Sequence, residues 1–508
     1  MLRFLPLAAV LLAGALLYAP VLGFDYTYYD DHALLVGLRG WFRDPTSLAR
    51  ALVEDVFARL APISAGQFYR PLLLVSFVAD TLVGDGRVSF YHATSLLLHL
   101  AATGALFALL RDLGHGPGLA AWLALLFCVH PIAVPVVAWL PCRNDSLLAL
   151  FAIATLLAMR ALVRGRRAAL VPAVWAGLAA VLLTKESGLA LVALLPLVAV
   201  AERRPRELLS RPLLVCALGA LLLTLAWVAL RRLVLEAFPV GASRAFGNLP
   251  MLIVYVGKSL FPVQLSVYPD PADASLVPGL AAIALLGLAA ACARRRLLGW
   301  AGFGLAWYAA FLAPTLLAPE ATSGLEHRLY VPLVGLVVFV AEALPSRPPM
   351  RRAAALAAAI VAATWAHASW RRLPDYADGP TFWRRAVTDS PRAVRAWQIL
   401  AFRSLTWERP ADAERAARGW IELEPRSAAA HAVLGASLAR QGRQADADAA
   451  LLRVLAVDPR AVRYWEAQAT ERESAGDAAA ARESRRLAEA LRRASAPAPP
   501  AAAAPAFP

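Results

Sequence analysis

Two adjacent carboxylates, Asp30 and Asp31, follow the first apolar segment of the chain, within the aromatic stretch Gly23-Phe-Asp-Tyr-Thr-Tyr-Tyr-Asp-Asp-His32. A carboxylate next to a reacting hydroxyl can take its proton as a general base, which is worth roughly 10²–10⁴-fold in rate. Two adjacent acids rarely do the same job, so we expect one to be the base and the other to position a partner group. A solvated loop with chance acids is the alternative for this stretch taken alone.

Further ionisable and polar side chains stand at the ends of apolar segments downstream. A charge at mid-membrane costs about 2.5–3.5 kcal/mol, so charges kept at segment ends are informative. A phosphate at the membrane surface needs cations, and Arg offers a bidentate fork where Lys offers a point charge. The candidate phosphate-binding cations are Arg70, Arg143, Lys185 and Arg328. The supporting candidates are Tyr69, His92, His130, Asp145, Glu186 and Glu326.

No cofactor follows firmly from these residues. Adjacent acids such as Asp30 and Asp31 could bind a divalent cation through oxygen ligands, and we keep that as an alternative. The four cysteines have neither the spacing of a metal site nor that of a disulfide framework, so buried thiols are expected.

Repeated apolar runs must position these groups. The chain has 508 residues, 59% of them hydrophobic, and a mean hydropathy of +0.56. About 20 apolar residues in a helix cross the hydrocarbon core. We expect about eleven spans, at 3–22, 89–110, 117–133, 145–163, 168–184, 187–201, 212–232, 276–293, 298–317, 328–344 and 353–370.

The basic residues indicate how these spans are oriented. A net charge of +15 would suit a nucleic-acid partner, but much of the excess lies in short clusters between apolar runs. Most of these arginines fall in alternate loops, which the positive-inside rule assigns to the cytoplasm. The N-terminus is therefore expected inside, and the long loop 23–88, the acid pair and the C-terminal region outside.

Prolines recur every 34 residues in the charged, Ala-rich C-terminal part, at Pro391, Pro425 and Pro459, and Gly442 and Gly476 keep the same interval. That period is typical of the tetratricopeptide repeat, which is a pair of helices. We expect about two and a half to three repeats. Each pair buries its apolar face only against its neighbours, so the array stacks and leaves a concave surface for a partner.

Taken together, these motifs resemble the membrane O-mannosyltransferases that carry C-terminal tetratricopeptide repeats, within the GT-C class of glycosyltransferases. The resemblance rests on motifs that occur in the family's order along nearly the whole chain. They are Tyr29-Asp30-Asp31-His-Ala-Leu-Leu, Tyr69-Arg70-Pro71-Leu72, Tyr91-His92, His130-Pro131-Ile132, Arg143-Asn144-Asp145, Lys185-Glu186, Phe261-Pro262 and Glu326-His327-Arg328-Leu329-Tyr330.

The resemblance implies an extracytoplasmic site, a polyprenyl- or dolichyl-phosphate sugar donor, inversion at the anomeric carbon, and Asp30 as the catalytic carboxylate. The chain departs from the family at two places. Pro135 stands where the family usually has an acid after His-Pro-Ile, and His327 separates Glu326 from Arg328.

We therefore predict an all-α protein. Residues 1–372 form a multi-span membrane glycosyltransferase domain, 373–493 a tetratricopeptide-repeat domain, and 494–508 a disordered Ala/Pro-rich tail. The predicted function is transfer of a sugar from a polyprenyl-phosphate donor to a protein or glycan acceptor. The acceptor could be bound by the repeats. The alternatives are a non-catalytic, membrane-anchored repeat scaffold for envelope assembly, and a lipid-linked glycan transporter or polymerase.

The expected partners are the lipid-linked donor, the acceptor and membrane lipids, with no nucleic acid. The richness in Ala, Arg and Pro is typical of a GC-rich bacterial genome. We accordingly expect an integral protein of a bacterial inner membrane.

Overall fold

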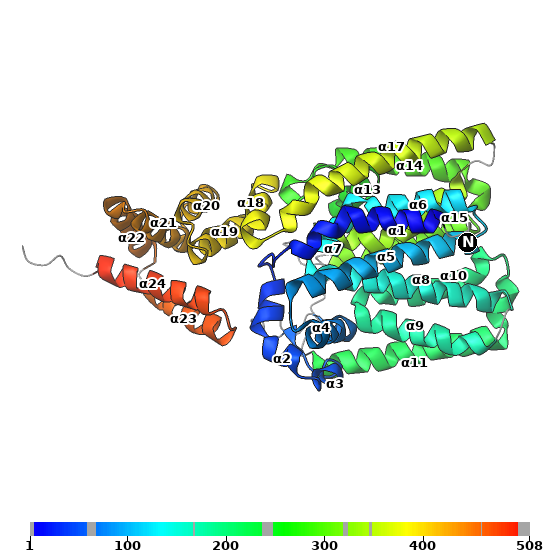
Figure 1. Ribbon diagram of the computed structural model, residues 1–508, viewed down its shortest axis with the longest axis horizontal. Helices are drawn as coiled ribbons and strands as arrows, with labels where there is room; N and C mark the ends of the chain where they lie inside the picture. Colours follow the sequence, from blue (N-terminus) through cyan, green and yellow to red (C-terminus); the bar gives the residue numbers. More distant parts are fainter. Residues whose placement is uncertain are drawn as a thin grey trace, which may run out of the picture. The chain divides into compact units, whose positions relative to one another are not determined.

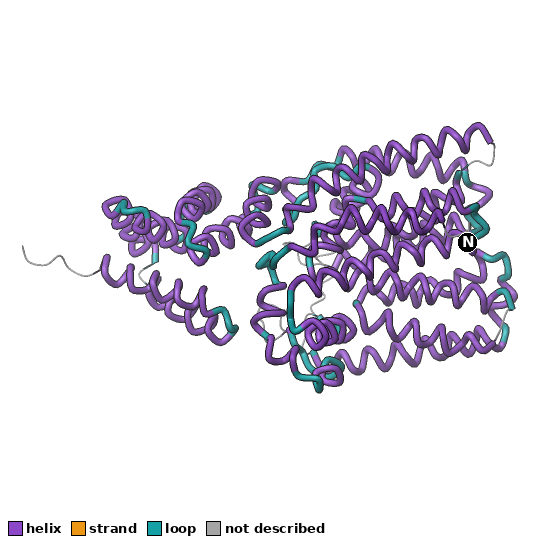
Figure 2. The backbone as a smooth tube through the Cα atoms, viewed as in Figure 1, coloured by secondary structure: helices purple, strands orange, loops and turns teal. Residues whose placement is uncertain are grey.

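The computed structural model describes residues 5–57, 68–165, 168–235, 247–317, 324–344, 348–458 and 460–495. Throughout these ranges the regular structure is helical and no strand occurs, which confirms the predicted all-α class (Figure 2). The chain divides into two compact units, Met1–Ser390 and Pro391–Pro508. The predicted tail falls mostly outside the described residues, because helix α24 runs to Ser495 and 496–508 are not described.

Apolar helices that run side by side make up most of the first unit (Figure 1). In chain order they are α1 (Leu5–Tyr18), α5 (Val88–Asp112), α6 (Pro117–Val129), α8 (Arg143–Val163), α9 (Val171–Thr184), α10 (Leu189–Ala201), α11 (Arg211–Val234), α13 (Leu249–Leu260), α14 (Val277–Cys292), α15 (Trp300–Leu312), α16 (Tyr330–Ala343) and α17 (Pro348–Arg372). Helices α15 and α16 approach so closely that a Cβ on Gly304 would lie 2.6 Å from the Gly335 carbonyl oxygen. Small residues permit such contacts between membrane helices.

Several of these helices could cross a membrane. Among the described residues, four segments have the length and apolarity, namely Leu5–Gly23, Val88–Asp112, Leu140–Val163 and Arg211–Val234. A fifth consists of Pro117–Val129 and Pro131–Ala138, bent by 51° at the His-Pro-Ile motif, where Pro131 cannot continue the helix. On α11 the leucines at 214, 218, 221, 222 and 225 are at least half exposed, as expected of a lipid-facing surface. The predicted number of eleven spans is not confirmed and stays a prediction.

Short helices cover the end of the bundle that carries the acid pair. They are α2 (Arg39–Arg43), α3 (Ser47–Arg50), α4 (Pro71–Gly84), α7 (Val134–Ala138) and α18 (Gly379–Asp389). Helices α2, α3 and α4 bury a common apolar core around Phe42 and Phe77, whose rings meet edge to face at 6.3 Å. The loop residues 58–67 lie outside the described part of the chain.

A buried arginine ties three long helices together where α5, α8 and α10 end. Arg160 on α8 is fully buried and pairs with Asp112 and with Glu202, whose Oε1 is 2.9 Å from Arg160 Nε. The guanidinium also lies 4.4 Å from the centroid of the Trp300 ring on α15. A buried arginine with this many partners contributes to helix packing, because leaving any partner unpaired would be costly.

Helix α18 lies in the first unit, although the predicted boundary put residues 373–390 with the repeats. It begins at Asp378, whose carboxylate accepts a hydrogen bond from Thr381 N at 2.7 Å, a side-chain N-cap. Its aromatic face explains the placement: Phe382 and Trp383 are fully buried, and the Phe382 ring packs against Tyr376. Exposing that face would cost several kcal/mol of apolar burial.

The second unit is a series of helix hairpins. It contains α19 (Val394–Thr406), α20 (Pro410–Leu423), α21 (Ala428–Arg440), α22 (Gln444–Val457), α23 (Ala461–Ser474) and α24 (Ala478–Ser495). Chain neighbours pair as α19 with α20, α21 with α22 and α23 with α24. Gly442 and Gly476, 34 residues apart, both adopt positive φ (78° and 76°) at the turn inside a hairpin, where glycine costs least. The last helix, α24, also contacts α19 and α21.

Candidate active site

The acid loop, residues 24–32, connects the end of the first helix to α2, and Asp31 holds it in shape. The buried Asp31 carboxylate accepts hydrogen bonds from Thr27 N (2.8 Å), Thr27 Oγ1 (2.9 Å), Tyr28 N (3.0 Å) and His32 N (2.8 Å). Tyr28 has φ +59°, a strained conformation for a bulky residue. The hydrogen bonds to Asp31 on both sides of Tyr28 therefore maintain a turn that the chain would not adopt unaided.

Asp30 lies beside this turn and is partly exposed. Its Oδ1 accepts a hydrogen bond from the Trp139 indole Nε1 at 2.9 Å. Burial and then the charge of Asp31 raise the pKa of Asp30 to about 7, against the hydrogen bond from Trp139 and the charge of Arg70. Burial also raises the pKa of Asp31, to about 6, against its hydrogen bonds. A carboxylate with a pKa near the working pH suits general-base catalysis.

Aromatic rings surround the acid loop. The ring of Tyr29 lies 5.0 Å from that of Trp139, 5.6 Å from that of Tyr268 and 5.8 Å from that of Trp383. The Trp383 indole Nε1 donates to the Thr27 carbonyl at 3.1 Å. Helix α18 thereby holds the acid loop from a position 356 residues further along the chain.

Asp145 and Lys185 form a buried ion pair between α8 and the turn that links α9 to α10. Lys185 Nζ lies 2.6 Å from Asp145 Oδ1, and the two residues are 9% and 2% exposed. Asp145 Oδ2 is buried and has no hydrogen-bond partner among the described residues. Burial lowers the pKa of Lys185, and Asp145 opposes that change.

Arg70 and Glu186 form a second ion pair next to the first. Arg70 Nε lies 3.4 Å from Glu186 Oε2, and the guanidinium stacks 4.3 Å from the Phe68 ring centroid. Glu186 Oε1 accepts a hydrogen bond from Tyr69 N at 3.2 Å, at the start of α4. The charge of Arg70 lowers the pKa of Asp30 and also that of Lys185, so Arg70 lies close to both.

Asp30 is hydrogen-bonded to Trp139, and the Trp139 ring contacts His327, the neighbour of Arg328, at 5.5 Å between centroids. The charge of Arg70 acts on both Asp30 and Lys185, and Lys185 is paired with Asp145. Arg70 directly precedes α4, Lys185 lies in the turn between α9 and α10, and His327 and Arg328 belong to the 3₁₀ turn Glu326–Leu329. Cations held by acids in a low-dielectric site can stabilise an anion at little reorganisation cost.

Arg143 binds a group of residues other than the acid loop and the two ion pairs. It is fully buried, lies 2.6 Å from Asp80 Oδ2, donates to the Tyr91 carbonyl at 2.6 Å and stacks 4.4 Å from the Phe77 ring centroid. Asp80 was not among the predicted site residues, although a single acid inside the apolar segment 71–84 indicates that it needs a cationic partner. His92 is also fully buried, next to Phe24 at the start of the acid loop.

Glu326 lies at the centre of a buried triad with Lys258 and Arg372. Its Oε1 lies 2.6 Å from Lys258 Nζ and its Oε2 lies 2.5 Å from Arg372 Nη2. Burial disfavours the charge of Glu326, but Arg372 and Lys258 hold the pKa of its carboxyl below the usual value. His130 lies nearby with Nε2 3.3 Å from the Ser259 carbonyl oxygen. The sequence analysis named neither Lys258 nor Arg372 as a site residue.

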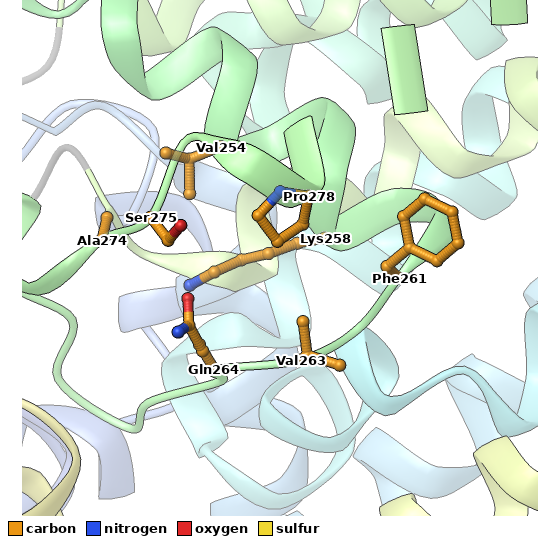
Figure 3. A pocket seen from close by; sticks show the side chains of 8 residues that line it. All are labelled: Val254, Lys258, Phe261, Val263, Gln264, Ala274, Ser275 and Pro278. Atoms are coloured by element: carbon orange, nitrogen blue, oxygen red, sulfur yellow. The ribbon is translucent and has the colours of Figure 1, made fainter. Parts of the chain in front are cut away.

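A small pocket opens beside Lys258. Figure 3 shows the amine of Lys258 directed toward the side-chain amide of Gln264; Val254 and Pro278 also line the pocket. Its volume is about 20 Å³, room for one water molecule. A sugar does not fit there.

Cys142, Asp145 and His327 offer three potential metal ligands. Their ligand atoms lie within 4.8 Å of one another, and no other such group occurs among the described residues. Asp145 is already paired with Lys185, and the charges of Arg70 and Arg328 act on it as well. The Asp145 carboxylate is therefore already neutralised by a cation, which leaves it less available as a ligand for a metal cation.

The chain is similar to known proteins over part of its length. No family model matches it. Over 164 residues it is 32% identical to Protein O-mannosyl-transferase TMTC1 of Mus musculus, which covers 31% of this chain and 17% of that protein. Over 146 residues it is 31% identical to Protein O-mannosyl-transferase TMTC2 of Homo sapiens, covering 28% of this chain and 17% of that one. The resemblance to protein O-mannosyl-transferases is confirmed.

The matched segment is short relative to these proteins. The chain spans about one sixth of the length of the curated relatives it matches. Together with its four or five apolar helices, the resemblance makes this an integral membrane protein.

Proposed function

We propose that this chain is a GT-C glycosyltransferase that moves a sugar from a polyprenyl-phosphate donor to a hydroxyl group of a protein acceptor. The observation that carries the proposal is the position of Asp30. Its carboxylate has a pKa of about 7 and is influenced by the charge of Arg70, which is itself paired with Glu186. A second acceptor class, a glycan hydroxyl, uses the same chemistry.

The transfer is a single displacement. Asp30 removes the proton from the acceptor hydroxyl as its oxygen bonds to the anomeric carbon. The bond between that carbon and the phosphate oxygen breaks, and its electron pair leaves with the lipid phosphate. Attack and departure on opposite faces invert the anomeric configuration. Arg70, Lys185 and Arg328 stabilise the departing phosphate, since charge-assisted hydrogen bonds are strongest where charge develops.

The remaining predicted residues support these groups. Asp31 shapes the acid loop, while Asp145 and Glu186 orient Lys185 and Arg70. We assign Arg143 the task of joining α8 to α4 and α5, in place of contact with the donor, because its donors are occupied by Asp80 and neighbouring groups.

We also propose the finer architecture suggested by the sequence. It comprises about eleven spans, counting shorter and bent helices, a cytoplasmic N-terminus in a bacterial inner membrane, and tetratricopeptide repeats that bind the acceptor outside. The hairpins α19–α24 and their 34-residue glycine register support the repeats.

The test is transfer by the purified full chain, reconstituted with a panel of polyprenyl-phosphate sugars and read as a mass increase on envelope proteins. Asp30→Asn should reduce the rate at least about 100-fold. Asp85→Asn is the matched control, because Asp85 is an exposed acid whose positive φ (53°) suits Asn. Wild-type transfer should rise with pH through a midpoint near 7, as Asp30 loses its proton. Full activity of Asp30→Asn would refute Asp30 as the base, whereas no transfer by the wild-type chain with any donor of the panel would leave the non-catalytic scaffold as the better assignment.

A further inference from the structure

We propose that Trp139 is a positioning residue for the transfer reaction: its indole N–H holds one oxygen of Asp30, so that the other oxygen faces the acceptor hydroxyl. This inference rests on the proposed role of Asp30 as the base.

The hydrogen bond itself is well formed. Trp139 Nε1 lies 2.9 Å from Asp30 Oδ1. An indole nitrogen is a donor only, so it can bind the carboxylate but cannot take up the proton that the acceptor releases. Among the described residues no side chain donates a hydrogen bond to Asp30 Oδ2. The pairing therefore distinguishes the two oxygens of Asp30 and leaves Oδ2 for the reaction.

The backbone around Trp139 keeps the indole in place. Trp139 lies between α7 and the 3₁₀ turn Leu140–Cys142, in extended conformation with φ −98° and ψ 110°. Its N–H donates to the Pro135 carbonyl oxygen at 3.0 Å, and Pro141 fixes the turn that follows. Pro135, which replaces the acid usual in the family, thus contributes a carbonyl to the Trp139 turn.

Two rings restrict rotation of the indole. Tyr29 of the acid loop lies 5.0 Å from it and His327 lies 5.5 Å from it, at interplanar angles of 54° and 75°. Trp139 is only 4% exposed. A side chain packed against two rings holds its hydrogen-bonding partner to a narrow range of orientations, as a catalytic group requires.

Losing the N–H has a specific consequence for the reaction. The bond favours the ionised form of Asp30, so its removal makes Asp30 a weaker acid. If Asp30 becomes about tenfold weaker, its ionised fraction at pH 7 falls about fivefold, while at pH 9 it stays within about 10% of the wild-type fraction. A purely structural defect would lower the rate equally at every pH.

The experiment is the pH–rate profile of the reconstituted full chain, for wild type, Trp139→Phe and Asp30→Asn. Trp139→Phe keeps an aromatic ring and removes the donor. We expect its midpoint to move to higher pH, with about a fivefold loss at pH 7 and near-complete recovery at pH 9. A profile with an unchanged midpoint overturns the inference, whether the rate equals that of wild type or is lower at every pH.

A second measurement does not depend on catalysis. Dicyclohexylcarbodiimide labels protonated carboxyl groups in apolar surroundings, and peptide mass spectrometry reports the labelling of Asp30. Labelling in Trp139→Phe, or in Trp139→Leu if the first variant does not fold, should persist to higher pH than in wild type. An unchanged labelling profile refutes the role of Trp139. Transfer activity retained by Asp30→Asn refutes the role of Asp30 as the base, and no transfer by the wild type with any donor refutes the proposed function itself, so the failures are distinguishable.

Discussion

Replacing either acid of the pair by alanine should affect stability very differently, although the two residues are adjacent. Asp31 accepts four hydrogen bonds within the acid loop, whereas Asp30 accepts one side-chain hydrogen bond, from Trp139. The matched pair Asp30→Ala and Asp31→Ala therefore separates the acid that is poised for chemistry from the acid that maintains the loop.

For Asp30→Ala two effects of similar size oppose each other. The folded state raises the pKa of Asp30 from 3.8 to about 7, so it binds the proton more tightly than the unfolded chain does. Its contribution is fully present below pH 4 and is lost as pH rises toward 8. Full burial would make that loss about 4 kcal/mol, and partial exposure reduces it to about 1–2 kcal/mol. Replacing Asp30 by alanine removes this ionisation penalty, and the gain offsets the cost of leaving the Trp139 N–H unpaired, which is about 1–3 kcal/mol.

Asp31→Ala leaves more donors without a partner. The N–H groups of Thr27, Tyr28 and His32 and the Thr27 hydroxyl lose their acceptor, and Thr27 is fully buried. Each buried donor left unpaired costs about 1–3 kcal/mol, and the strained turn at Tyr28 loses its support. Allowing for non-additivity, we expect Asp31→Ala to be about 3 kcal/mol less stable than Asp30→Ala.

The assay is thermal unfolding of the two variants in detergent at pH 8, followed by tryptophan fluorescence. Asp30→Ala should melt within about 3 °C of wild type and Asp31→Ala roughly 5–10 °C lower. The melting temperature of Asp30→Ala relative to wild type should be lower at pH 5 than at pH 8. At pH 5 most Asp30 in the wild type is protonated, so the wild type no longer bears the ionisation penalty. Equal melting temperatures for the two variants at pH 8 would refute the assignment of Asp31 as the loop's anchor.

Three further outcomes follow from buried pairs and from α18. Lys185→Met leaves Asp145 unpaired and should cost about 3–5 kcal/mol; the double variant with Asp145→Leu should regain most of the thermal stability without regaining transfer. Arg160→Met should lower the melting temperature through a loss of about 3–5 kcal/mol, while transfer per folded molecule, measured on the soluble fraction, is unchanged. Truncation after Ser390 should keep transfer to a small hydroxyl acceptor, whereas truncation after Asp378 should abolish it, because the second removes Trp383 from the acid loop.

The helical class and the grouping of several site residues could be predicted from the sequence. Apolar runs of membrane length specify helices, and charges kept at their ends gather where those ends meet. That logic groups Arg70, Asp145 and Lys185, of which Asp145 and Lys185 form an ion pair and Arg70 acts through its charge on Asp30. It worked because it needs only the order of the segments and their alternation across a membrane.

The individual partners could not be predicted in this way. Arg143 carries the same charge as Arg70, and only its packing against Asp80 distinguishes it. Residues 379–389 have the composition of the hairpins that follow, but Trp383 finds its partner Thr27 in a distant part of the chain. The number of membrane spans is hard to predict for the same reason, since α10 has only 13 residues and contains Pro196. Such features depend on tertiary contacts, which periodicity does not encode.

The hydrogen bond between Trp383 and Thr27 can form only late in biosynthesis. Thr27 is synthesised early, and its partner is synthesised 356 residues later. At 5–20 residues per second, that interval is roughly 20–70 s. During this time the strained turn at Tyr28 has Asp31 to support it but lacks the indole of α18 and the backbone hydrogen bond from Asp25 N to the Ala377 carbonyl. The acid loop is thus completed only when nearly all of the first unit has been made.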